Sequence, residues 1–144
     1  MKKLLLKRFD KSIPIPEYKT KGSVGFDLYA RETITIKSKE IVYIPLNIAV
    51  KIPDNCFFLL ANRSSTHKLG ITCVNGIGVG DLDFSGNEDE YKFPAYNFTD
   101  SEVIIEKGMR IAQGIIIPFE KVEIEEVDNL DENSRGGFGS TGVY

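Results

Sequence analysis

The chain has 144 residues, of which 42% are hydrophobic and 27% charged, and its formal net charge is −3. This length suits one domain with a full core, and the negative charge argues against a protein that coats nucleic acid. Two cysteines are too few for a disulfide scaffold, and no apolar stretch approaches the length of a membrane span, so we expect a soluble, cytoplasmic protein that binds neither membranes nor nucleic acid.

The hydrophobic pattern along the chain has a dominant period of two, which is typical of β-strands. The N-terminal segment 1–9 has an apolar run of only three residues before Lys7, so we expect a first strand there and not a signal peptide. Further strand-like segments follow at 33–37, 41–52, 56–61, 103–106 and 111–119. Turn residues separate them, and helical periodicity is absent apart from one short turn near 66–69. The pattern predicts an all-β sandwich or barrel.

Segment 61–70 contains Arg63, Ser64 and Ser65 directly after an apolar strand. An arginine and consecutive hydroxyls at a strand end suit a phosphate chain, although a capped turn would use the same residues. His67 is the only histidine, so neither a zinc site nor a histidine-based catalytic triad is expected. Acid–base chemistry would therefore depend on a carboxylate.

Segment 75–81 is rich in glycine and ends at Asp81. Its spacing does not fit a dinucleotide-binding loop, and no helix follows it. We expect a hairpin whose glycines let a flat ligand approach the backbone, with Asp81 at its lip. The alternative is a solvated aspartate in an ordinary turn.

The C-terminal segment divides into an acidic linker and a glycine-rich strip. Residues 122–132 carry six acidic side chains and no basic one, and four glycines lie within 135–142. Such a strip can fold over a ligand through its amides and hydroxyls, or it can be a frayed terminus. We expect a β-barrel body at 1–121 and, within the same single domain, a linker and flexible arm at 122–144 that closes a site.

Five segments together resemble, in order, the five motifs of the trimeric dUTPases. The first four are Gly22–Ala30, Ala61–Ile71, Asn75–Gly86 and Lys107–Gln113, and the fifth is Arg135–Gly142. The resemblance spans nearly the whole chain. It implies a distorted jelly-roll barrel, a homotrimer with sites at subunit interfaces, and hydrolysis of dUTP to dUMP and pyrophosphate.

The resemblance also implies roles for individual residues. Asp81 matches the carboxylate that activates the attacking water, and Phe84 matches the ring beneath the deoxyribose. Asp27 is expected to support the site from behind and not to bind metal. The remaining substrate-binding positions are Asn75 and Gly78 for uracil, Arg63, Ser64, Ser65 and Gln113 for phosphates, and Arg135, Phe138, Gly139, Ser140 and Thr141 in the closing arm. Magnesium would be held mainly by the triphosphate and waters, with no protein ligand assigned.

The chain departs from the family pattern at several positions. Phe84 replaces a usual Tyr, Gly80 replaces a usual Ile, and Arg135 lies two positions later than the usual leading arginine of motif five. Segment 87–94 lengthens the chain after motif three. Two alternatives stay open: a dCTP deaminase-like enzyme of the same fold, and a dUTPase-like protein that regulates a partner according to its nucleotide state.

Overall fold

The structure, a computed structural model, describes residues 1–144 and is almost entirely β. The all-β prediction is therefore confirmed, and η1 is the short turn that the sequence placed near 66–69. The elements are β1 (Leu5–Arg8), β2 (Phe26–Tyr29), β3 (Ile34–Ile36), β4 (Ile41–Pro45), β5 (Ile48–Lys51), β6 (Cys56–Asn62), η1 (Thr66–Leu69), β7 (Ile71–Cys73), β8 (Gly78–Gly80), β9 (Lys92–Asn97), β10 (Val103–Ile105) and β11 (Arg110–Pro118).

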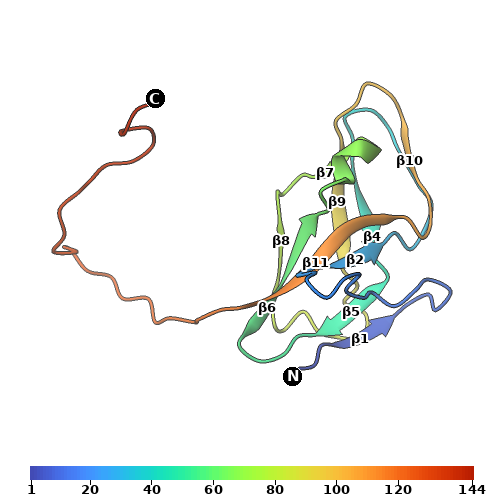
Figure 1. Cartoon of the computed structure of the whole chain (residues 1–144), viewed down its shortest axis with the longest axis horizontal. Helices are drawn as coiled ribbons and strands as arrows, with labels where there is room; N and C mark the ends of the chain where they lie inside the picture. The colour runs from blue at the N-terminus through green and yellow to red at the C-terminus, as the bar shows by residue number, and fades with distance from the viewer.

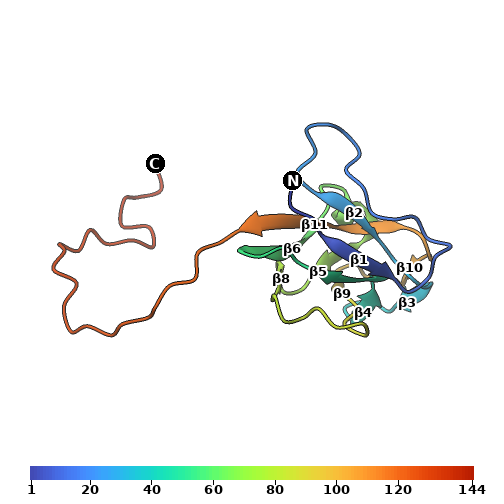
Figure 2. The same ribbon diagram turned by 90° about the horizontal axis from the view of Figure 1, so that it is seen from below.

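Antiparallel pairing gathers the strands into four small sheets around one core (Figures 1 and 2). The sheets have the orders β1-β5, β10-β3, β2-β11-β6-β8 and β4-β9-β7. β11 lies between β2 and β6 and pairs with both. The arrangement is the jelly-roll-like barrel that the resemblance implied.

Side-chain alternation and one glycine explain how the central sheet packs. In β6, Phe58 and Leu60 point into the core while their neighbours are only half-buried. Gly114 on β11 faces Phe58, and a Cβ at Gly114 would lie 2.5 Å from the Phe58 Cζ atom. The absent side chain lets the Phe58 and Phe26 rings pack with centroids 6.0 Å apart. Close packing here fixes the position of β6, and β8 pairs with β6 at the edge of the same sheet.

The expected strand at 41–52 is interrupted at Asn47, so that two strands, β4 and β5, replace one. Asn47 has a φ of 70° and is 1% exposed. Its side chain accepts a hydrogen bond from the Asp10 amide (2.6 Å) and donates one to the Asp10 carbonyl (2.9 Å). An asparagine tolerates this left-handed backbone, and its amide group satisfies the buried loop.

The prediction of a hairpin at 75–81 is wrong, because the strands on either side of this turn do not pair with each other. β7 pairs with β9 and β8 pairs with β6, so the turn between β7 and β8 passes from one sheet to another. β9 was not predicted at all, because Pro94 lies within it and proline is rare inside central strands. β9 nevertheless lies between β4 and β7.

Residues 121–144 are exposed throughout and extend away from the barrel (Figures 1 and 2). Within this segment the backbone turns at 137–142, where the Ser140 amide donates to the Gly137 carbonyl and the Gly142 amide donates to the Gly139 carbonyl. Gly139 has a φ of 88°, a conformation that suits glycine. The structure contains no helix with the length and apolar character needed to span a membrane.

Candidate active site

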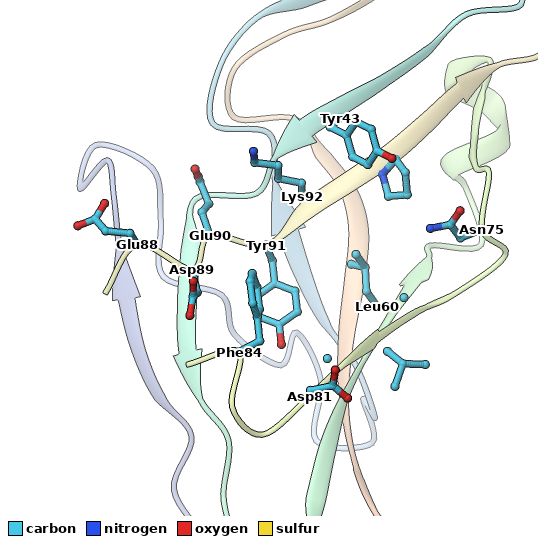
Figure 3. Close-up of a pocket in the computed structure, with 14 residues that line it drawn as sticks. Tyr43, Leu60, Asn75, Asp81, Phe84, Glu88, Asp89, Glu90, Tyr91 and Lys92 are labelled. Atoms are coloured by element: carbon cyan, nitrogen blue, oxygen red, sulfur yellow. The ribbon is translucent and has the colours of Figure 1, made fainter. Parts of the chain in front are cut away.

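A pocket of about 540 Å³ lies between β8 and the segment that leads into β9, and we call it the β8 pocket (Figure 3). Four residues that the sequence singled out line it: Asn75, Gly78, Asp81 and Phe84. The full lining is Tyr43, Leu60, Asn75, Gly78, Val79, Gly80, Asp81, Phe84, Glu88, Asp89, Glu90, Tyr91, Lys92 and Pro94.

The wall formed by β8 depends on the close approach of two backbones. Gly78 pairs with Leu60 of β6, and a Cβ at Gly78 would lie 3.0 Å from the Leu60 Cβ. Before β8, the Gly76 amide donates to the Cys73 carbonyl (3.0 Å), which closes the turn that carries Asn75. A flat ligand in the pocket can thus meet bare backbone at Gly78 and the amide side chain of Asn75.

Aromatic rings form the opposite wall of the β8 pocket. The Phe84 and Tyr91 rings meet edge to face with centroids 5.1 Å apart, and Tyr91 packs in turn on Phe58, at 4.6 Å. Phe84 is 38% exposed, whereas Tyr91 is 6% exposed. Phe84 therefore offers an apolar surface to a ligand while the core supports it from behind.

The pocket carries four carboxylates, of which two accept hydrogen bonds from the protein and a third, the exposed Glu88, makes only a long ion pair. Glu90 accepts two hydrogen bonds from Arg31 (2.7 and 3.0 Å), Asp89 accepts one from the Gly86 amide (2.7 Å), and Glu88 lies 3.9 Å from Lys7. The Asp81 carboxylate, by contrast, makes neither a side-chain hydrogen bond nor an ion pair. It is exposed at the mouth of the pocket, held by a turn in which the Phe84 amide donates to the Asp81 carbonyl (3.2 Å).

A second group of predicted residues lies where β6 ends and β11 begins. Arg63 donates from Nε to Asp27 Oδ1 (2.9 Å), and Arg110 donates from Nη1 to Asp27 Oδ2 (3.0 Å). We call these three residues the arginine cluster. One carboxylate thus orients two guanidinium groups. Arg63 also donates from Nη1 to the Arg110 carbonyl (3.1 Å), and the N–H groups that remain on the two arginines are available for an anion.

Local structure fixes the backbone of this second group. Thr66 is buried at the start of η1, and its hydroxyl accepts from the Arg63 amide (2.8 Å) and donates to the Ile111 carbonyl (2.9 Å). Ser64 and Ser65 follow Arg63 in the same turn, Ser64 exposed and Ser65 half-buried. Ser65, the N-cap residue of η1, makes no capping hydrogen bond through its side chain, so Thr66 and not a serine holds the turn, and both serine hydroxyls are without a hydrogen bond.

Gln113 lies next to this group on β11. Its Nε2 donates to the Asn62 carbonyl (2.9 Å), and its carboxamide lies against Gly25, where a Cβ would come within 3.3 Å of the Gln113 Cδ atom. The absence of a side chain at Gly25 makes room for this amide. One face of Gln113 is therefore held by the backbone.

The structure divides the predicted site residues into three groups. Asn75, Gly78, Asp81 and Phe84 share the β8 pocket, whereas Arg63, Ser64, Ser65 and Gln113 do not line it. Arg135 and the strip from Phe138 to Thr141 are exposed on the extended arm, with Phe138 also in a left-handed conformation, φ 51°. A single chain in this conformation does not bring the three groups together.

Sequence reasoning missed three residues of these groups. Arg110 was within a recognised motif, but its contact with Asp27 depends on the pairing of β2 with β11. Glu90 and Tyr91 lie in the lengthened segment 87–94, which reads as a polar loop. Only the aromatic residues Tyr91 and Phe93, which follow the acidic residues 88–90, could have drawn attention to it.

Comparison with known proteins gives a consistent result. The family model described as dUTPase matches residues 11–142. A deoxyuridine 5'-triphosphate nucleotidohydrolase of Rickettsia bellii (strain OSU 85-389) is 43% identical over 135 residues, which are 90% of this chain and 88% of the relative. One from Hydrogenobaculum sp. (strain Y04AAS1) is 39% identical over 145 residues, covering 98% and 99%. Among solved structures, a Staphylococcus bacteriophage 80alpha dUTPase with dUPNHPP is similar at a TM-score of 0.86 and 25% identity, covering 99% of this chain and 100% of the other.

Proposed function

This chain belongs to the dUTPase family and is a dUTP diphosphatase, and we propose that Asp81 is the general base of its reaction. The water oxygen bonds to the α-phosphorus, the bond from that phosphorus to the bridging oxygen of pyrophosphate breaks, and the water proton passes to the Asp81 carboxylate. The observation that carries this proposal is that Asp81 is the one carboxylate of the β8 pocket that makes neither a hydrogen bond nor an ion pair. An aspartate is normally ionised near neutral pH and can accept the proton.

The β8 pocket supports the recognition of a deoxyuridine. We propose that uracil lies against β8, where the Gly78 backbone and the Asn75 amide can pair with its polar edge. Phe84 then lies beneath the deoxyribose and leaves no room for a 2′-hydroxyl. Steric exclusion of the 2′-hydroxyl, and not charge, would therefore distinguish dUTP from UTP.

The separation of the three groups of residues supports an assembly with shared sites. The dUTPase family is oligomeric, and we propose a homotrimer in which the β8 pocket of one subunit meets the arginine cluster, Ser64, Ser65 and Gln113 of another. These residues would bind the phosphates. The arm would close over the nucleotide, with Phe138 covering uracil and Arg135, Gly139, Ser140 and Thr141 over the phosphates, so that water is excluded.

The residues of the site are compatible with a divalent ion that is bound by the substrate phosphates and not by protein side chains. No group of three or more histidine, cysteine, aspartate or glutamate side chains in the structure is arranged to hold a metal. Mg²⁺ commonly binds to substrate phosphates and keeps several waters. We propose that Mg²⁺ is held in this way, and when bound it would neutralise charge on the triphosphate.

The cellular setting is part of the proposal. Cys56 and Cys73 are buried free thiols in different sheets. Reduced cysteines are usual in proteins of the cytoplasm. We propose that the enzyme acts there, with dUTP as its partner and with no membrane or nucleic acid involved.

Product analysis tests the function directly. The protein is incubated with dUTP, UTP, dTTP or dCTP in the presence of Mg²⁺, and nucleoside monophosphate, pyrophosphate and ammonia are measured. We expect pyrophosphate and dUMP from dUTP and little from the other three. Ammonia from dCTP would instead support the deaminase alternative, which the names of the relatives do not favour.

A further inference from the structure

Tyr91 occupies a place in the β8 pocket that a side chain at position 80 would otherwise fill. A Cβ at Gly80 would collide with the Tyr91 hydroxyl, and it would lie 2.9 Å from the Tyr91 Cζ atom and 3.0 Å from the Phe58 Cβ. Gly80 does not have a positive φ, so its backbone conformation does not require glycine. The small residue at position 80 is therefore explained by the space that the phenol needs.

The Tyr91 hydroxyl has no partner in the protein. It is the only buried side-chain nitrogen or oxygen of the structure that makes no hydrogen bond. A buried hydroxyl without a partner destabilises a folded protein, so such a group calls for a physical reason. Tyr91 lines the β8 pocket, and its buried hydroxyl points toward Asp81, beside the Phe84 ring (Figure 3). A ligand in this pocket can supply the missing partner.

The hydroxyl would act as a hydrogen-bond donor. Burial, together with the nearby charges of Asp81 and Asp89, raises the pKa of Tyr91 to about 12. The phenol thus keeps its proton at neutral pH. Its partner in a ligand must then be an acceptor oxygen.

We propose that the Tyr91 hydroxyl donates a hydrogen bond to the 3′-hydroxyl oxygen of the deoxyribose of bound dUTP. The 3′-hydroxyl is the only hydroxyl of this sugar, and the ring and bridging oxygens are weaker acceptors. A sugar seated on Phe84 lies beside Tyr91, because the two rings are in edge-to-face contact. This inference rests on the proposed function, since it assumes that the sugar lies over Phe84.

A ligand pair tests this contact independently of folding. The affinities of wild type and Tyr91→Phe are measured by calorimetry for α,β-imido-dUTP and for its 2′,3′-dideoxy counterpart. We expect Tyr91→Phe to weaken binding of the first ligand by roughly 5- to 10-fold, as for the loss of one buried hydrogen bond. Both proteins should bind the dideoxy ligand equally. Tyr96→Phe on β9 is the matched control and should bind both ligands like wild type.

The melting temperature distinguishes a ligand contact from a structural role. Because Tyr91→Phe removes an unpartnered hydroxyl and keeps the ring, the free variant should melt at or above the wild-type temperature. As a second variant, Gly80→Ala should displace the hydroxyl and reproduce the selective loss for the ligand that has a 3′-hydroxyl.

Each other outcome overturns the proposal in an identifiable way. Equal affinity of wild type and Tyr91→Phe for α,β-imido-dUTP would exclude any contact with the nucleotide. An equal loss for both ligands would show that the hydroxyl acts on Asp81 or on the pocket wall. Failure of wild type itself to bind or hydrolyse dUTP would instead reject the proposed function, and this inference with it.

Discussion

Asp27 and Arg63 form an ion pair of 2.9 Å that joins β2 to the end of β6, and the same carboxylate also binds Arg110 at 3.0 Å. Only 16% of the Asp27 side chain and 24% of the Arg63 side chain are exposed. A partly buried carboxylate that orients two arginines can position them for a phosphate chain without touching it.

The first prediction concerns this ion pair. Asp27→Asn should keep the shape of the side chain but release both guanidinium groups. We expect kcat/KM for dUTP to fall by roughly 10- to 100-fold, because misplacing a binding group by about 1 Å has effects of this order. Steady-state kinetics measure the change. Asp100→Asn is the control, since its partner Lys39 is half-exposed and the pair lies on the surface; a similar loss in both variants would contradict a specific role for Asp27.

The second prediction concerns the general base. Asp81→Asn should retain the fold and the binding of α,β-imido-dUTP while losing the charge that accepts a proton. General base catalysis contributes ~10²- to 10⁴-fold, so kcat should fall by about this factor. Asp83→Asn, also exposed, should have a milder effect. A loss of less than about tenfold in single-turnover assays of Asp81→Asn would reject the assignment.

How well the strands could be predicted from the sequence differs from one strand to the next. Period-two alternation located β3, and a high content of β-branched and aromatic residues located β6, β10 and β11. β9 escaped because Pro94 reads as a break, although its neighbours on both sides hold it in a sheet. Local pattern does not report such long-range pairing.

The candidate site was predictable as a set of residues and not as an arrangement. Motif order indicated Asp81, Phe84 and Arg63, but the division into separate groups depends on the sheet order. Tyr91 directly follows the acidic residues 88–90, whose composition predicts a solvated loop. Its burial follows from Gly80, eleven positions earlier in the chain, and a pair so distant has no local signature.

The third prediction concerns sugar discrimination. Phe84→Ala should open space beneath the deoxyribose and lower the ratio of kcat/KM for dUTP to that for UTP by about tenfold or more, within the range for filling an apolar pocket. Phe84→Tyr is the control and should keep the ratio, because the ring remains. If Phe84→Ala leaves the ratio unchanged while the protein stays folded, Phe84 is part of the pocket wall and does not select the sugar.

The fourth prediction concerns the arm. Truncation after Ser134 should leave a folded, oligomeric barrel, since β11 ends at Pro118 and residues 121–144 are exposed. Binding of uracil and deoxyribose should persist in the β8 pocket. Catalysis should fall sharply, because the arm would no longer exclude water or place donors over the phosphates. Thermal melting, size-exclusion chromatography and kinetics on the truncated protein separate these effects.

Subunit mixing then tests whether the arm serves a neighbouring subunit. The eleven residues of segment 122–132 can span up to roughly 35 Å when extended, and we expect this length to reach a neighbouring subunit of the proposed trimer. When inactive Asp81→Asn protein is mixed with inactive truncated protein under conditions of subunit exchange, some sites combine an intact Asp81 with an arm from the other chain. We therefore expect partial recovery of dUTP hydrolysis. Recovered activity would show that the arm acts in trans, because no site closed only by its own chain can contain both intact parts. Exchange verified by mass spectrometry without any recovered activity would exclude an arm that acts in trans.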